Sequence, residues 1–248
     1  MLHKLSLPKV ALTTADETIR IMSQREIEQN LNEANLRWFQ RKIRAWGKEH
    51  LRDFPWRQTK DPYTIFVAEF LLQQTDAPRV VPVYQQLLKE YPTLSTLAEA
   101  SVTEIADIMK PLGLHYRALR LHQAACLMIE NPVYERKIPD NETELLQLSG
   151  VGKYMARSIC ANAFGQTTAV LDTNISRILQ RFFGLKSRIK RARDDHFFWE
   201  LAQRVAPSTN VGFWNLALID FGAAVCIFRE PHCDKCPLRK RCKYYEMR

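Results

Sequence analysis

Apolar residues recur at intervals of three and four along most of the chain, which is the spacing of one face of an α-helix. Between residues 27 and 46 this pattern follows Ser23 and Glu26, which match a capping box at a helix start. Buried helices are expected over residues 65–74 and 80–90, and Ser101 and Asn141 begin further helical patterns. We find no alternation of period two, no Asn-Gly hairpin and no internal repeat. The sequence therefore predicts an all-α protein of many short helices.

Composition and charge narrow the class of protein. The hydrophobic fraction of 46% and the charged fraction of 25% are ordinary globular values, which excludes wholesale disorder. No stretch approaches about 18 uncharged apolar residues, and the N-terminus has no continuous apolar block, so we expect neither a membrane span nor a secretory signal. The 36 lysines and arginines exceed the 27 acidic residues, and the resulting net charge of +9 favours an anionic partner.

Most of the cysteines gather at one end of the chain: Cys226, Cys233, Cys236 and Cys242 follow one another with gaps of six, two and five residues. This clustering, without an export signal, predicts a metal site in the reducing cytoplasm rather than a disulfide scaffold. Four thiolates suit an iron–sulfur cluster or a structural zinc ion, and the uneven gaps favour the cluster. Cys126 and Cys160 stand alone in apolar sequence and are expected in the core.

Two glycines precede an apolar run over residues 155–164. Gly150 and Gly152 leave backbone N–H groups free to point outward together at a helix start, where the helix dipole favours an anion. The segment can therefore hold one DNA phosphate, although a tight turn between two helices would explain the same glycines.

Two carboxylates lie in otherwise apolar sequence. Glu69 is the one acidic residue of the helix expected over residues 65–74, which suits a raised pKa and a general acid, or a salt-bridged core residue. Asp172 follows Tyr154 by eighteen residues and is expected to cap the helix over residues 174–183. A residue can both cap a helix and take part in catalysis.

The segment LSGVGKY at residues 148–154, the LDTN segment around Asp172 and the four-cysteine tail together resemble a known family. It is the helix–hairpin–helix base-excision DNA glycosylases that carry a [4Fe–4S] cluster, the endonuclease III and MutY superfamily. The resemblance extends from Leu36 to Tyr245. It implies an all-α fold of two lobes with a DNA-binding cleft between them: a six-helix lobe over 65–166, with the helix–hairpin–helix near 143–160, and a lobe built from 31–64 and 167–248. The cluster would lie at 226–242, and residues 1–30 would form an extension.

The resemblance also implies catalytic roles for Glu69, Asp172 and Tyr154. Glu69 would protonate a base extruded from DNA, the anionic Asp172 would stabilise the positively charged sugar, and the two would face one cleft. Lyases of the family carry a lysine at the position of Tyr154, and Lys153 should face elsewhere because adjacent helical residues are about 100° apart. The protein is thus expected to be a monofunctional glycosylase.

Residues expected to contact DNA are implied in the same way. Gln73 and Gln74 resemble the wedge that fills the vacated base stack, and His115, Tyr116 and Arg117 a second contact with the strand. The remaining contacts are a phosphate site at Gly150, Gly152 and Lys153, and the basic cluster loop with Arg239 and Arg241. The basic run over residues 186–193 is either a further contact or a solvated loop, and Trp199 and Trp214 are expected in the core.

Thymine or uracil opposite guanine is the expected target, and the protein is expected to act as a monomer on mispaired or damaged double-stranded DNA in the nucleoid. The segments around Asp53 and Cys242 resemble those of archaeal-type thymine enzymes, and the chain stops six residues after Cys242, where adenine enzymes continue into a further domain. Adenine removal from A·G or A·8-oxoguanine is the alternative, which Gln73, Gln74 and Tyr154 favour. A DNA-binding module without catalysis and a bifunctional lyase are further alternatives.

Overall fold

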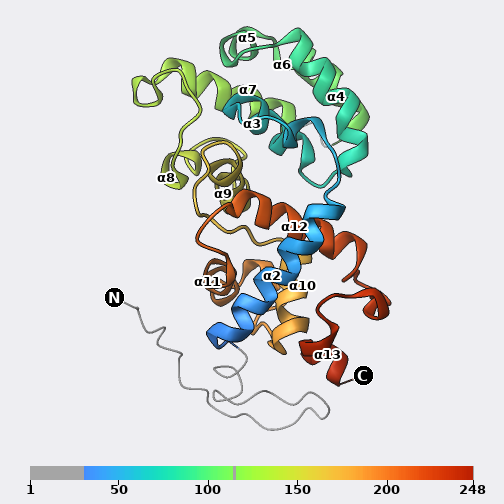
Figure 1. Ribbon diagram of the computed structural model, residues 1–248. Helices are drawn as coiled ribbons and strands as arrows, with labels where there is room; N and C mark the ends of the chain where they lie inside the picture. The colour runs from blue at the N-terminus through green and yellow to red at the C-terminus, as the bar shows by residue number, and fades with distance from the viewer. Residues whose placement is uncertain (1–30, 114–115, 248) are drawn as a thin grey trace.

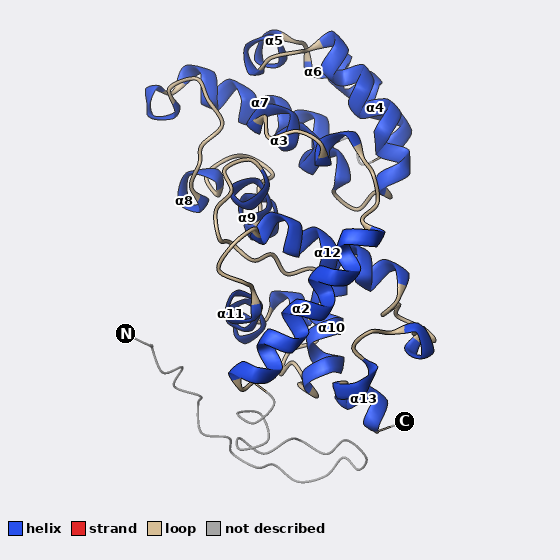
Figure 2. Ribbon diagram, in the orientation of Figure 1, coloured by secondary structure: helices blue, strands red, loops and turns tan. Residues whose placement is uncertain are grey.

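The computed structural model describes residues 31–113 and 116–247, and every regular element in these ranges is a helix (Figures 1 and 2). The predicted all-α class is therefore confirmed. The helices are α2 (Glu33–His50), α3 (Pro62–Leu72), α4 (Ala77–Glu90), α5 (Leu94–Glu99), α6 (Val102–Met109), α7 (Tyr116–Glu130), α8 (Glu142–Leu145), α9 (Lys153–Asn162), α10 (Thr173–Phe183), α11 (His196–Val205), α12 (Val211–Ala224) and α13 (Lys243–Glu246). None of them combines the length and apolar character that crossing a bilayer requires.

Local capping chemistry sets several of the helix starts. Ser101 and Glu104 form the predicted capping box of α6, and the Asn141 side chain caps α8. The prediction for α3 was wrong at its start, because Asp61 caps the helix and Pro62 occupies its first turn, so α3 begins before residue 65. Ser23 lies outside the described residues. The chain is not helical at residues 31–32, so the apolar pattern from residue 27 does not continue as one helix to residue 46.

The buried apolar residues form two clusters. The first draws on α3 to α9 and extends from Phe54 to Cys160, and the second joins α2 to α10, α11 and α12 and includes Trp199 and Trp214. The two tryptophans and Cys160 are core residues as predicted, whereas Cys126 is half-buried. Because Phe54 already packs in the first cluster, that cluster begins before residue 65. The division of the chain into two lobes stays a prediction.

Helix α12 brings distant parts of the chain together. It packs against both α2 and α10, and Figure 1 shows α3 to α7 at one end of the molecule and α2, α10 and α13 at the other. The contact with α2 needs a glycine, because a Cβ atom on Gly47 would lie 2.7 Å from the Cβ atom of Ala217. Helix α2 is thereby held against the C-terminal quarter of the chain.

Candidate active-site cleft

One cleft of about 1430 Å³ contains all three side chains predicted to be catalytic. Glu69 enters it from α3, Tyr154 from the first turn of α9, and Asp172 from the start of α10. Glu69 and Asp172 lie close enough to Tyr154 for their charges to affect its ionisation. Three segments up to about a hundred residues apart in the sequence therefore converge on one site.

Glu69 is a carboxyl group with little access to water. Burial raises its pKa from 4.5 to about 7, while a hydrogen bond from Ser158 and the charge of Arg57 act in the opposite direction. The Ser158 Oγ atom donates to Glu69 Oε1 at 2.6 Å and accepts from Asn162 Nδ2 at 3.1 Å. At neutral pH a substantial fraction of Glu69 is protonated, so this side chain can donate a proton.

Asp172 is stabilised as an anion by the helix that it caps. Its Oδ1 atom accepts from the Ile175 amide at 2.7 Å, which confirms the predicted N-cap. Burial raises its pKa, whereas the amides of Ile175 and Asn174 and the charge of Arg177 oppose that rise. The helix N-terminus therefore favours the anionic form of Asp172, and this anion can face a positive charge in the cleft.

Tyr154 lines the same cleft as the two carboxyl groups and is a neutral phenol. Burial raises its pKa well above 10, and the charges of Glu69 and Asp172 raise it further. The phenol therefore keeps its proton over the physiological pH range. It can donate a hydrogen bond, and it has no amine with which to form a Schiff base.

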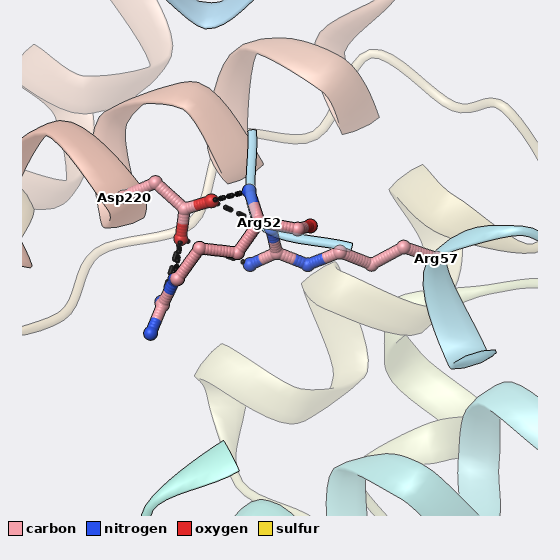
Figure 3. A network of polar contacts seen from close by, with 3 residues as sticks. All are labelled: Arg52, Arg57 and Asp220. Carbon is pink, nitrogen blue, oxygen red and sulfur yellow. Dashed lines mark hydrogen bonds and ion pairs between the residues drawn. The ribbon is translucent and has the colours of Figure 1, made fainter. Parts of the chain in front are cut away.

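Arg57 lines the cleft and is paired with the buried Asp220, and neither residue was among those predicted. Figure 3 shows that Asp220 is ion-paired with two arginines. Arg57 Nη1 lies 2.6 Å from Oδ2 of Asp220, and Arg52 Nη2 lies 2.6 Å from its Oδ1. Burial alone would raise the pKa of Asp220, but the arginine hydrogen bonds outweigh burial and lower it. The pair holds Arg57 at the cleft, where its charge favours the ionised form of Glu69. The sequence offered a signal for Asp220, because this residue, like Glu69, is a carboxylate within an otherwise apolar helical sequence.

The glycines of the predicted hairpin have different structural roles. Gly152 is the N-cap of α9, and a Cβ atom there would meet no other atom within 4 Å. Gly150 has a φ of +82°, and its Cβ atom would lie 2.9 Å from the Phe70 ring. Lys153, which follows Gly152, has its Nζ atom 4.6 Å from the centre of the Trp199 ring. The hairpin thus presents an open backbone surface at Gly152 and a closely packed one at Gly150.

Gln73 and Gln74 also differ in how closely they are packed: Gln73 is bound to the hairpin, and Gln74 is exposed. Gln73 Nε2 donates to the Gly150 carbonyl at 3.0 Å, so its amide ties α3 to the hairpin. Gln74 is exposed, lines the cleft and has a φ of +54°, which is unusual for a residue other than glycine. Tyr116 is 41% exposed, and the guanidinium group of Arg120 lies over its ring, 4.7 Å from the ring centre. His115 lies outside the described residues.

Arg117 was predicted to contact DNA, and its position in the structure does not allow this contact. Its side chain is fully buried, and its guanidinium group donates to backbone carbonyls of Leu71, Gln73 and Gly113. A group enclosed in this way does not reach a phosphate. The helical pattern of α7 could not reveal this, because a basic residue in the first turn is usually exposed.

The four clustered cysteines line one small cavity of about 20 Å³, together with Arg181 and Tyr244. Within the described part of the chain, no three His, Cys, Asp or Glu side chains are gathered as a site for a metal ion. Burial raises the pKa of Cys236 to about 12. Thiolates at this position therefore require a cationic partner.

The basic residues near this cavity are exposed and contact aromatic rings. The Arg241 guanidinium lies 4.9 Å from the Trp38 ring centre, and that of Arg239 lies 5.5 Å from the Tyr245 ring centre. From the basic run over residues 186–193, Arg193 reaches the lining of the main cleft.

Comparisons with known proteins show which proteins this chain resembles. A family model described as HhH-GPD superfamily base excision DNA repair protein matches residues 67–204. A thymine/uracil-DNA glycosylase from Methanothermobacter thermautotrophicus is 37% identical over 203 residues, which are 81% of this chain and 90% of that protein. An adenine DNA glycosylase from Rattus norvegicus is 32% identical over 86% of this chain and 43% of its own length. The solved structure of a thermostable thymine-DNA glycosylase has a TM-score of 0.81 at 34% identity, covering 86% of this chain and 97% of that one.

The raised pKa of Glu69 predicts a pH-dependent effect of Glu69→Gln on stability. A carboxyl group whose pKa is higher in the folded than in the unfolded chain carries no ionisation penalty below about pH 4.5 and the full penalty above about pH 7. The variant is expected to gain stability over the wild type as pH rises through this window, by up to about 3 kcal/mol. Thermal unfolding between pH 4 and pH 8 measures the difference.

Glu104→Gln is the matched control. Hydrogen bonds from Ser101 lower the pKa of Glu104, so its replacement should lose stability relative to the wild type as pH rises. A Glu69→Gln difference that stays constant between pH 4.5 and pH 7 would show that Glu69 ionises normally.

Proposed function

The chain belongs to the HhH-GPD superfamily of base excision DNA repair proteins, and we propose that it is a monofunctional DNA glycosylase that removes thymine or uracil mispaired with guanine. The observation that carries the proposal is the cleft in which Glu69, Tyr154 and Asp172 meet. Its substrate is double-stranded DNA, and the net charge of +9 favours binding to the phosphate backbone. We further propose that it acts as a monomer in the cytoplasm, on DNA of the nucleoid.

The proposed chemistry follows from charge development at the glycosidic bond. As the bond between the sugar and the base breaks, its electron pair leaves with the base, which takes a proton from Glu69. The sugar becomes positively charged, and the Asp172 carboxylate faces that charge. A water molecule then adds to the sugar carbon and passes its proton to a carboxylate of the cleft, which completes hydrolysis.

Selection of a mispaired base begins before this step. Extruding a nucleotide costs a few kcal/mol, and the cost is lowest where the base pair is weak. The open amide at Gly152 and the α9 N-terminus would hold a phosphate beside the cleft, with Lys153 near it. Gln74 and Tyr116, which are exposed at the cleft, would contact the duplex at the vacated position. Arg239 and Arg241 would bind the backbone further along the DNA.

Several features support hydrolysis without strand cleavage. A lyase needs an amine at the sugar carbon, and Tyr154 stands where lyases of the superfamily carry that lysine. The cleft lysines have other contacts: Lys153 lies over the Trp199 ring, and Lys60 Nζ donates to the Asn162 carbonyl at 3.0 Å.

The cysteine cavity suits a [4Fe–4S] cluster with Cys226, Cys233, Cys236 and Cys242 as ligands. Four thiols from a single short loop line one cavity, as a cluster with one ligand per iron requires. When bound, the cluster would link the four cysteines and would thereby order the loop that carries Arg239 and Arg241. The four cysteines are outside the lining of the main cleft, so no step of the hydrolysis involves them.

A panel of duplexes tests the activity. Protein mixed with G·T, G·U, A·G and A·8-oxoguanine duplexes is expected to release thymine and uracil, measured by chromatography of the free base. Glu69→Gln should lower the single-turnover rate by about 10²–10⁴-fold while DNA binding persists. The removal of adenine alone would favour the second candidate, which similarity to adenine glycosylases supports. Release of no base from any duplex would leave a DNA-binding module.

Borohydride trapping tests the absence of lyase activity. Borohydride reduces a Schiff base between an amine and an abasic sugar to a stable bond, so a lyase becomes covalently joined to DNA. The wild type is expected to give no efficient adduct on abasic DNA, whereas Tyr154→Lys should give one. Efficient trapping of the wild type would identify a bifunctional enzyme.

Metal analysis tests the cluster. The purified protein is expected to contain about four iron atoms per chain and to absorb near about 400 nm. Cys236→Ser should lose both properties, and Cys126→Ser, which lies outside the cavity, should keep them. A colourless protein with one bound zinc ion would contradict the assignment.

A further inference from the structure

Arg117 is a buried cation that has no acidic partner among the described residues. It lies in the first turn of α7, its side chain has no exposed surface, and it takes part in none of the ion pairs found in residues 31–113 and 116–247. Burial lowers the pKa of its guanidinium group. Removing an unpaired charge from water is costly, so the surrounding structure must compensate for it.

Backbone carbonyls from two separate segments provide this compensation. Nη1 donates to the carbonyls of Leu71 at 2.7 Å and Gln73 at 2.8 Å, and to the Thr75 hydroxyl at 3.1 Å. Nη2 donates to the carbonyls of Leu112 at 3.2 Å and Gly113 at 3.0 Å. The first group lies at the C-terminus of α3, where carbonyls lack helical partners and the helix dipole is negative.

The segments joined in this way border the cleft. Gln74 lies between two residues that bind Arg117, and its left-handed backbone costs of the order of 1 kcal/mol and needs such support. Gln73 in turn donates to Gly150 of the hairpin. Tyr116, next to Arg117, is exposed in the same cleft. One guanidinium group therefore connects the end of α3, the segment before α7 and, through Gln73, the hairpin.

We propose that Arg117 is a positioning residue for base extrusion, which holds Gln74 and Tyr116 in the arrangement that fills the space left by the departing nucleotide. The proposal rests on the glycosylase function proposed above. Arginine suits this task because its planar fork offers donors in two directions, whereas lysine has a single nitrogen that cannot serve both segments.

Arg117→Lys tests the proposal because it keeps the charge and removes the fork. Extrusion is required only when the target base is stacked and paired in a duplex. The variant should therefore excise uracil from a G·U duplex about tenfold more slowly, while its rate on uracil in a single strand stays within about twofold of the wild type. Fluorescence of 2-aminopurine beside the target, which rises on unstacking, should increase less with the variant than with the wild type.

Arg79→Lys is the matched control. Arg79 is exposed, and its Nη2 atom donates to the Pro111 carbonyl at 2.9 Å, so it binds the segment before α7 without reaching α3. Both of its rates should match those of the wild type. Thr75→Val, which removes one acceptor of Arg117 and preserves its shape, should show a smaller loss restricted to the duplex, and it replaces Arg117→Lys if that variant does not fold.

Equal losses on duplex and single strand, or no loss on either, would overturn the proposal. A wild type that releases no base from G·U would count against the glycosylase function instead. The comparison of 2-aminopurine fluorescence between wild type and variant would then still decide whether Arg117 supports extrusion.

Discussion

Removal of carboxyl groups from water is the constraint around which the cleft is built. Glu69, Asp172 and Asp220 are each largely enclosed, and an isolated carboxylate in such surroundings is unstable. The structure accommodates each one differently. Glu69 shifts its pKa towards neutrality, Asp172 binds the amides of a helix N-terminus, and Asp220 binds two arginines. Two carboxyl groups with different proton affinities in one cleft are what acid-assisted bond cleavage requires.

Buried arginines play a corresponding structural part. Arg57 is held by Asp220 on α12, and Arg117 is held by carbonyls at the end of α3 and before α7. Both connect segments that are distant in the sequence and that border the cleft. Gln74, an exposed polar residue of the cleft, therefore lies beside residues that the fully buried Arg117 binds, and Arg57 lines the same cleft. Replacing either arginine should change geometry more than surface charge.

Local sequence patterns were reliable where the physics is local. The caps at Ser101, Asn141 and Asp172 were predicted correctly, because a capping side chain bonds to amides two or three residues away. The carboxyl groups of Glu69 and Asp172 were noticed because each interrupts apolar sequence, and both line one cleft as expected. The start of α3 was placed too late, at residue 65, because the cap at Asp61 and the first turn at Pro62 were not recognised.

The amino-acid sequence was enough to establish the helical class, the starts of α6, α8 and α10, and two carboxyl groups, Glu69 and Asp172, that line the cleft. It could not tell which charged residues are enclosed. Arg117 was expected at the DNA surface and is fully buried, and the partnership of Arg57 with Asp220 was not expected. Helical periodicity describes one helix at a time, whereas burial depends on what packs against it. Arg52 and Arg57 meet Asp220 only because α12 returns to the N-terminal part of the chain about 160 residues later.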